Sequence, residues 1–211
     1  MSAHHDHGAG SCCSHNHNFD GMNPDYKARL WLVIAINGVM FLAEIIAGSI
    51  AGSQALKADA LDFLADTLTY GISLAVIGMP LKTRATAALA KGISLTLMAA
   101  WVFGSTIYNV FVLHVPTAPI MASVGIAAFL ANLVSVLLLV KYKDGDANVR
   151  SVWLCSRNDM IGNVIVMAAA VGVWQTHTAW PDLIVAGLMA GLFLTSSVKI
   201  IRQALAERKT A

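Results

Sequence analysis

Residues 30–50 read LWLVIAINGVMFLAEIIAGSI, an apolar run in which Glu44 is the one charged side chain. A helix that crosses a bilayer needs about 20 mostly apolar residues, so this run is long enough to span one. Of all 211 residues, 57% are hydrophobic and 12% are charged, whereas soluble domains carry about 25% charged residues. The composition therefore predicts a membrane protein. A net charge of +2, without a basic stripe, argues against nucleic acid as a partner.

Further apolar windows of spanning length follow the first one. They cover residues 54–79, 92–113, 120–140, 152–176 and 183–201. All five prolines lie between these windows or just before them, where a missing N–H costs least. Tryptophans favour the ends of spans, and we expect Trp101 to be an exception that packs inside the bundle. The pattern predicts an all-α membrane protein, a bundle of six transmembrane helices.

Basic residues predict how the bundle is oriented. Lys and Arg precede the first window and follow the last one, and they occupy alternate connections, one of which holds Lys82, Arg84 and Lys91. The remaining connections contain neither Lys nor Arg. By the positive-inside rule both termini are cytoplasmic. We expect residues 1–26 to form a disordered cytoplasmic segment, 27–206 the six-helix transmembrane domain, and 207–211 a short cytoplasmic tail.

Charged side chains fall inside the windows, where each costs at least several kcal/mol. The acids outnumber the bases: Glu44, Asp59, Asp62, Asp66 and Asp159 against Lys57 and Arg157. Two bases cannot neutralise five acids, so some of the acids must hold protons or bind a cation. For Glu44, Lys57 and Arg157 we favour a structural role. Lys57 would then pair with Glu44 or Asp59, and Arg157 with a lipid headgroup or Asp146.

The spacing of two residue pairs predicts a metal site. Asp62 and Asp66 are four residues apart, so they share one face of a helix. Cys155 and Asp159 repeat this spacing in the fifth window, and both pairs approach the middle of the membrane. Together they offer four ligands to one ion. A buried cysteine is more often a small hydrophobic residue, which leaves Ser156, Asn158 and Asn163 as alternative oxygen donors.

The N-terminal segment has the composition of a metal-binding tract. Five of the seven histidines lie within the first 17 residues, beside two cysteines, and such tracts bind metals. We expect this tract to capture ions; the alternative is a polar tail without a role. Its ligands would be His4, His5, His7, Cys12, Cys13, His15 and His17. The other histidines, His114 and His177, lie at the outer ends of windows, which argues against a haem-bearing electron-transfer subunit.

These motifs resemble the cation diffusion facilitator family of metal/proton antiporters. The stretch ALKADALDFLAD at residues 55–66 is similar to the family's second-helix motif, with Asp62 and Asp66 at its ligand positions. CSRNDMIGN at residues 155–163 is similar to the fifth-helix motif, with Asp159 and Cys155 at its ligand positions. Trp-Pro-Asp at residues 180–182 resembles the usual start of the sixth helix. Two features depart from the family: Cys155 stands where His is usual, and a short form is expected because the sequence stops before the usual cytoplasmic domain.

The resemblance implies a secondary transporter. Such a protein exports a divalent transition metal from the cytoplasm in exchange for protons, as a homodimer in the bacterial inner membrane. Three aspartates and a thiolate suit Zn²⁺, with Cd²⁺ or Co²⁺ as alternatives, and the acids would hold protons when no metal is bound. Buried acids alone also suit a proton channel or a metal-sensing membrane subunit. We expect no enzyme, because the sequence has no nucleophile–base set and no nucleotide-binding loop.

Overall fold

Six helices make up the part of the chain that the computed structural model describes, residues 24–75, 81–112, 114–143 and 147–210. The predicted N-terminal tract from His4 to His17 lies outside these residues, as does Asp146. The helices are α1 (Pro24–Ala51), α2 (Gln54–Ala75), α3 (Leu81–Val112), α4 (Ala118–Leu139), α5 (Ala147–Thr176) and α6 (Trp180–Thr210), with a short 3₁₀ helix, η1 (Val140–Tyr142). The described ranges contain no strand. The all-α prediction is confirmed.

Five of these helices are long and apolar enough to cross a membrane. The remaining one, α2, has 22 residues, which at about 1.5 Å per residue matches the thickness of a bilayer core of about 30 Å. It is less apolar because it carries Lys57, Asp59, Asp62 and Asp66. Helix α2 therefore carries several charges that need shielding from lipid by its neighbours.

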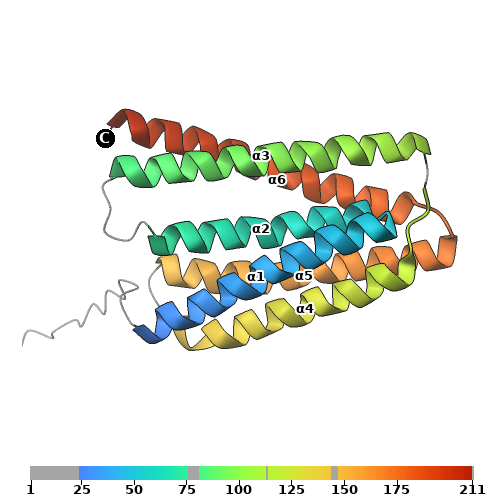
Figure 1. Cartoon of the computed structure of the whole chain (residues 1–211), viewed down its shortest axis with the longest axis horizontal. Coiled ribbons are helices and arrows are strands. Elements are labelled where there is room, and N and C mark those ends of the chain that lie inside the picture. Colours follow the sequence, from blue (N-terminus) through green and yellow to red (C-terminus); the bar gives the residue numbers. More distant parts are fainter. Residues whose placement is uncertain (1–23, 76–80, 113, 144–146, 211) are drawn as a thin grey trace, which may run out of the picture.

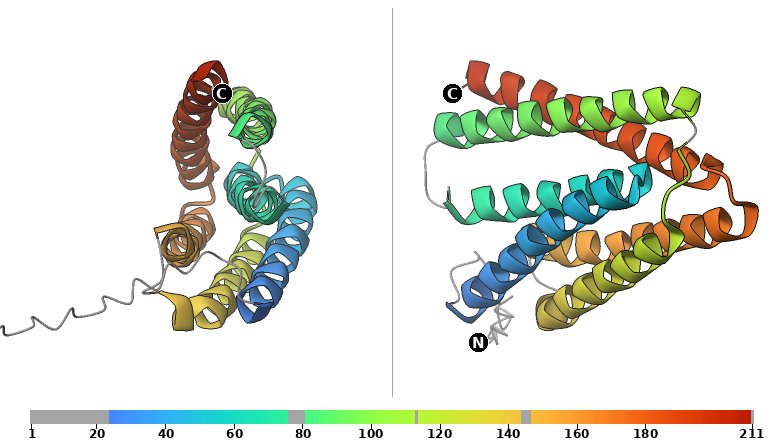
Figure 2. Two further views of the ribbon diagram at one scale, coloured as in Figure 1. Left: turned by 90° about the vertical axis from the view of Figure 1, so that its left-hand side faces the viewer. Right: turned by 45° about the vertical axis from the view of Figure 1, so that its right-hand side comes forward.

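Helix α2 has that shielding because it lies between two groups of helices. Helices α3 and α6 run side by side in one group, α1, α4 and α5 form the other, and α2 contacts α1, α3, α5 and α6 (Figures 1 and 2). A Cβ added at Gly92 of α3 would lie 2.7 Å from Ile201 Cγ1 of α6, so glycine permits the close approach of this pair. Helix α1 begins and α6 ends at the same end of the bundle (Figure 1).

The turn between α1 and α2 sets the depth of the acidic residues that follow. Gly52 adopts a φ of 71°, which favours glycine, and Ser53 N donates to Gly48 O at 2.9 Å, as in a Schellman motif. The Ser53 hydroxyl then accepts a hydrogen bond from Leu56 N at 3.1 Å and caps α2. The C-cap of α1 and the N-cap of α2 lie within two residues of each other, and together they fix where α2 starts.

Two expectations about helix positions were wrong. Trp101 is 52% exposed, with Lys57 Nζ 5.7 Å from its ring centroid, so it lies on the outer surface of the bundle rather than inside it. Helix α3 begins at Leu81, eleven residues before the predicted window. The alanine-rich stretch 81–91 favours helix although its charges lower its hydropathy. Lys91, assigned above to a connection, is consequently a helical residue.

Candidate metal centre

Three of the predicted ligands come together between α2 and α5. The carboxyl groups of Asp62 and Asp159 lie close enough across the two helices to interact. Asp66, one turn along α2, also interacts with Asp159. The i, i+4 spacing in α2 therefore does place both of its carboxyl groups on the face that meets α5.

Tyr70 joins this cluster, although the sequence analysis did not single it out. Its hydroxyl donates to Asp66 Oδ2 at 2.5 Å and lies within hydrogen-bonding reach of the Cys155 thiol. Cys155 is a free, exposed cysteine one turn before Asp159, so it borders the cluster rather than lying at its centre. A second i, i+4 step, from Asp66 to Tyr70, was the signal in the sequence.

Lys91 is the other residue that the sequence analysis missed. From α3 its Nζ donates a hydrogen bond to Thr69 Oγ1 of α2. The ammonium group also interacts electrostatically with Asp66 and Cys155. The sequence analysis assigned Lys91 to a connection and therefore gave it no contact with α2. The cluster thus receives one cation from a third helix.

Glu44 and Asp59 form a second buried pair, which also interacts with Asp62. The two carboxyl groups, from α1 and α2, are fully buried and near enough to interact. None of their four oxygens makes a hydrogen bond of acceptable geometry. The prediction that Lys57 pairs with one of them is wrong. Its ammonium group instead lies over Trp101 and interacts with Asp182, since a long side chain near a helix end extends toward the interface.

The alternative oxygen donors differ in position. Ser156 and Asn163 are fully buried, and neither the Ser156 hydroxyl nor the Asn163 amide has a hydrogen-bond partner. Asn158 is exposed, and its Oδ1 accepts a hydrogen bond from Arg157 Nη2 at 3.4 Å. Arg157 itself is exposed and lies 5.4 Å from the Trp153 ring centroid. Of the three alternatives, only Ser156 and Asn163 therefore have buried polar groups left to offer.

The cluster is a set of interacting acids rather than a closed coordination shell. Among the residues that the structure describes, no three His, Cys, Asp or Glu side chains are arranged to hold a metal ion. Its carboxyl groups lie near enough to interact, and two carboxyl groups can share a hydrogen bond only when one of them holds a proton. A divalent cation would compete with these protons for the same oxygens. The arrangement is therefore suited to exchange protons for a metal.

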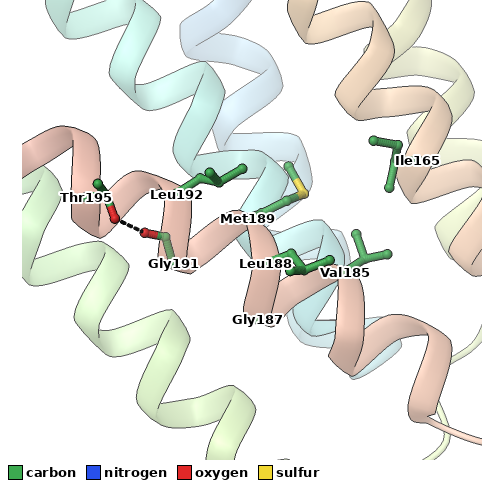
Figure 3. A pocket seen from close by; sticks show the side chains of 8 residues that line it. All are labelled: Ile165, Val185, Gly187, Leu188, Met189, Gly191, Leu192 and Thr195. Carbon is green, nitrogen blue, oxygen red and sulfur yellow. Dashed lines mark hydrogen bonds between the residues drawn. The ribbon is translucent and has the colours of Figure 1, made fainter.

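A groove elsewhere on the bundle lacks this chemistry. It has a volume of about 470 Å³ and lies between Ile165 of α5 and the α6 residues Val185, Leu188 and Leu192 (Figure 3). The Thr195 hydroxyl at its edge donates to Gly191 O of its own helix at 2.9 Å. Its walls are otherwise apolar and suit lipid contact rather than ion binding.

Known proteins are similar to this chain in sequence. Residues 30–207 match the family described as the cation efflux transmembrane domain. The metal cation efflux system protein CzcD of Cupriavidus metallidurans is 28% identical over 187 residues, covering 83% of this chain and 58% of CzcD. The zinc transporter ZitB of Pectobacterium atrosepticum is 27% identical over 204 residues, covering 90% of this chain and 64% of ZitB. A cadmium, cobalt and zinc/H(+)-K(+) antiporter of Bacillus velezensis is 24% identical over 207 residues.

The chain spans about three fifths of the length of CzcD and ZitB, and the family match includes all or most of each of the six helices that the structure describes. With five apolar helices of spanning length around one polar helix, it is a multi-pass membrane protein, and it belongs to the cation efflux family.

Proposed function

We propose that this chain exports a divalent transition metal, most readily Zn²⁺, from the cytoplasm across the bacterial inner membrane in exchange for protons. The observation that carries the proposal is the cluster of Asp62, Asp66 and Asp159, whose carboxyl groups come from two helices and interact with one another. Relatives named as a zinc transporter and as a metal cation efflux protein support the choice of substrate.

In this mechanism protons and metal take turns on the same oxygens. A zinc ion entering from the cytoplasm displaces protons from the three aspartates, since a carboxylate must lose its proton to bind a metal. When the bundle opens to the other side, the ion leaves and protons return. Separate helix groups around α2 supply elements that can rock against each other, as in other secondary transporters. The inward proton gradient then drives the metal outward.

Cys155 is the fourth ligand in this proposal. Its thiol lies beside Tyr70 and interacts with Asp66 and Asp62, at the position where a soft sulfur atom favours Zn²⁺ or Cd²⁺ over hard cations. Co²⁺ is a further alternative substrate. Ser156 and Asn163 are the oxygen donors available should the thiol not bind.

Three further features belong to the proposal. Both termini are placed in the cytoplasm by the distribution of Lys and Arg. The N-terminal tract from His4 to His17 collects zinc on that side. The transporter functions as a homodimer, as the family resemblance implies, with its contacts made by membrane helices.

The test is zinc flux and zinc-dependent proton movement in proteoliposomes that contain the purified chain. Wild type is expected to move zinc one way and protons the other, and Asp62→Ala and Asp159→Ala are expected to abolish both. Lys82→Met, which alters an exposed residue at the cytoplasmic end of α3, is the matched control and should transport normally. Transport by both aspartate variants would remove the cluster as the site. Proton flux without added metal would identify a proton channel instead.

A further inference from the structure

Lys91 reaches the aspartate cluster from a different helix group. It lies in α3, which pairs with α6, whereas the acids lie in α2 and α5 (Figure 1). Its ammonium group donates to Thr69 Oγ1, and it interacts with Asp66 on the preceding turn of α2 and with Cys155 of α5. One side chain therefore links α3 to both helices that carry the cluster.

Lys91 differs in position from Lys57, the basic residue of α2 itself. Lys57 lies near the start of α2, where it interacts with Asp182 and Trp101, and it does not reach the cluster. Lys91 is only partly exposed and its charge is directed at two of the proposed ligands. A fixed positive charge beside carboxyl groups attracts them and repels an incoming cation, and both effects strengthen in a low-dielectric interior.

We propose that Lys91 is a tethered cation of the transport site, which pairs with the Asp66 side of the cluster between transport cycles and must be displaced when the metal binds. This inference rests on the function proposed above. Because Lys91 belongs to α3, its displacement ties metal binding to the position of the α3–α6 pair relative to α2. Lys91 thus lowers metal affinity. It also makes the arrangement of the helices differ between the empty site and the loaded site.

The test is the zinc concentration that gives half-maximal flux in proteoliposomes, for variants that separate charge from hydrogen bonding. Lys91→Met removes both, and Lys91→Gln keeps a donor for Thr69 without the charge. Both are expected to lower the half-maximal zinc concentration about tenfold or more, because a repelling charge close to the ion is gone. Lys91→Arg retains the charge and should match wild type. Lys82→Met, a charge removed from the same helix away from the cluster, should also match wild type.

The inference is overturned if Lys91→Met leaves the half-maximal concentration unchanged, or if Lys91→Arg lowers it as much as Lys91→Met does. A merely structural lysine would weaken transport when removed and would not tighten zinc affinity. Should Lys91→Met fail to transport, equilibrium zinc binding in detergent replaces flux, with the Lys91→Met, Asp62→Ala double variant as the baseline for zinc held outside the cluster. Tighter binding than wild type above that baseline supports the inference, and equal or weaker binding overturns it.

Asp62→Ala, measured in parallel, separates this inference from the proposed function. If Asp62→Ala transports zinc like wild type, the cluster is not the transport site and both proposals fail. If Asp62→Ala is inactive while Lys91→Met has wild-type affinity, the transport site stands and only the role of Lys91 is wrong.

Discussion

Asp182 Oδ1 accepts a hydrogen bond from Ser53 Oγ at 2.6 Å, which joins residues 129 positions apart in the sequence. The same carboxylate accepts hydrogen bonds from Gln54 N at 2.8 Å and Ala55 N at 3.1 Å. It therefore caps the first turn of α2 from the first turn of α6. This acid, in the first turn of an apolar helix, is structural, and it fixes the height at which α2 presents Asp62 and Asp66.

Replacing Asp182 by alanine should destabilise the protein. The change leaves two backbone N–H groups and one hydroxyl in a buried region without their acceptor, at a cost of about 2–4 kcal/mol. We expect a lower midpoint of thermal unfolding in detergent for Asp182→Ala. Asp182→Asn keeps one acceptor oxygen and should lose less. If Asp182→Ala unfolds at the wild-type temperature, the carboxylate does not secure α2.

Glu44→Gln should not destabilise the protein. The carboxyl groups of Glu44 and Asp59 are near enough to interact, and none of their oxygens makes a hydrogen bond of acceptable geometry. The new amide can donate to the Asp59 carboxyl group. The gain of one such bond is about 0.5–1.5 kcal/mol. We expect an equal or higher midpoint of thermal unfolding at neutral pH, and a lower one for Glu44→Ala, which leaves a cavity. A lower midpoint for Glu44→Gln would mean that Glu44 neutralises a cation, as first predicted from the sequence.

The sequence was enough to predict the fold, because apolar length and the positions of proline report directly on membrane helices. It was also enough to predict that Asp62, Asp66 and Asp159 lie together, since helical periodicity assigns each to a face of its helix. Periodicity does not say which faces meet. The pairing of Glu44 with Asp59 depends on the register of α1 against α2, which Gly48 sets by packing against Leu56 and Lys57.

Lys91 shows a second limit of sequence reasoning. Hydropathy windows end where charges begin, whereas α3 continues ten residues beyond Lys91 toward its start at Leu81. A basic residue counted as part of a connection was therefore a helical residue that faces the cluster. Tyr70 was missed for a different reason, because its spacing from Asp66 does not by itself show that an aromatic residue in an apolar run donates its hydroxyl to that acid.

Cys155→Ser should change metal preference more than it changes turnover. Sulfur is a soft ligand that favours Cd²⁺ more strongly than a hydroxyl does, and Cys155 borders the cluster. We expect the half-maximal concentration for Cd²⁺ flux to rise severalfold more than that for Zn²⁺. Lys82→Met, at an exposed position of α3 away from the proposed ligands, is the control and should leave the preference unchanged. Equal changes for the two metals would show that Cys155 is not a ligand.

Zinc affinity should fall as the pH falls. Protons and zinc compete for the oxygens of Asp62, Asp66 and Asp159, so acid favours the protonated carboxyl groups and alkali favours the metal complex. Each proton displaced by zinc makes the apparent affinity fall about tenfold per pH unit. Titration of zinc binding in detergent at several pH values gives this slope, and weakly buffered solutions give the protons released per ion directly.

Asp66→Asn removes one competing carboxyl group and should make the slope shallower, with Asp62→Ala as the baseline for binding outside the cluster. A slope that is the same for wild type and Asp66→Asn would mean that the proton leaving on zinc binding comes from another group.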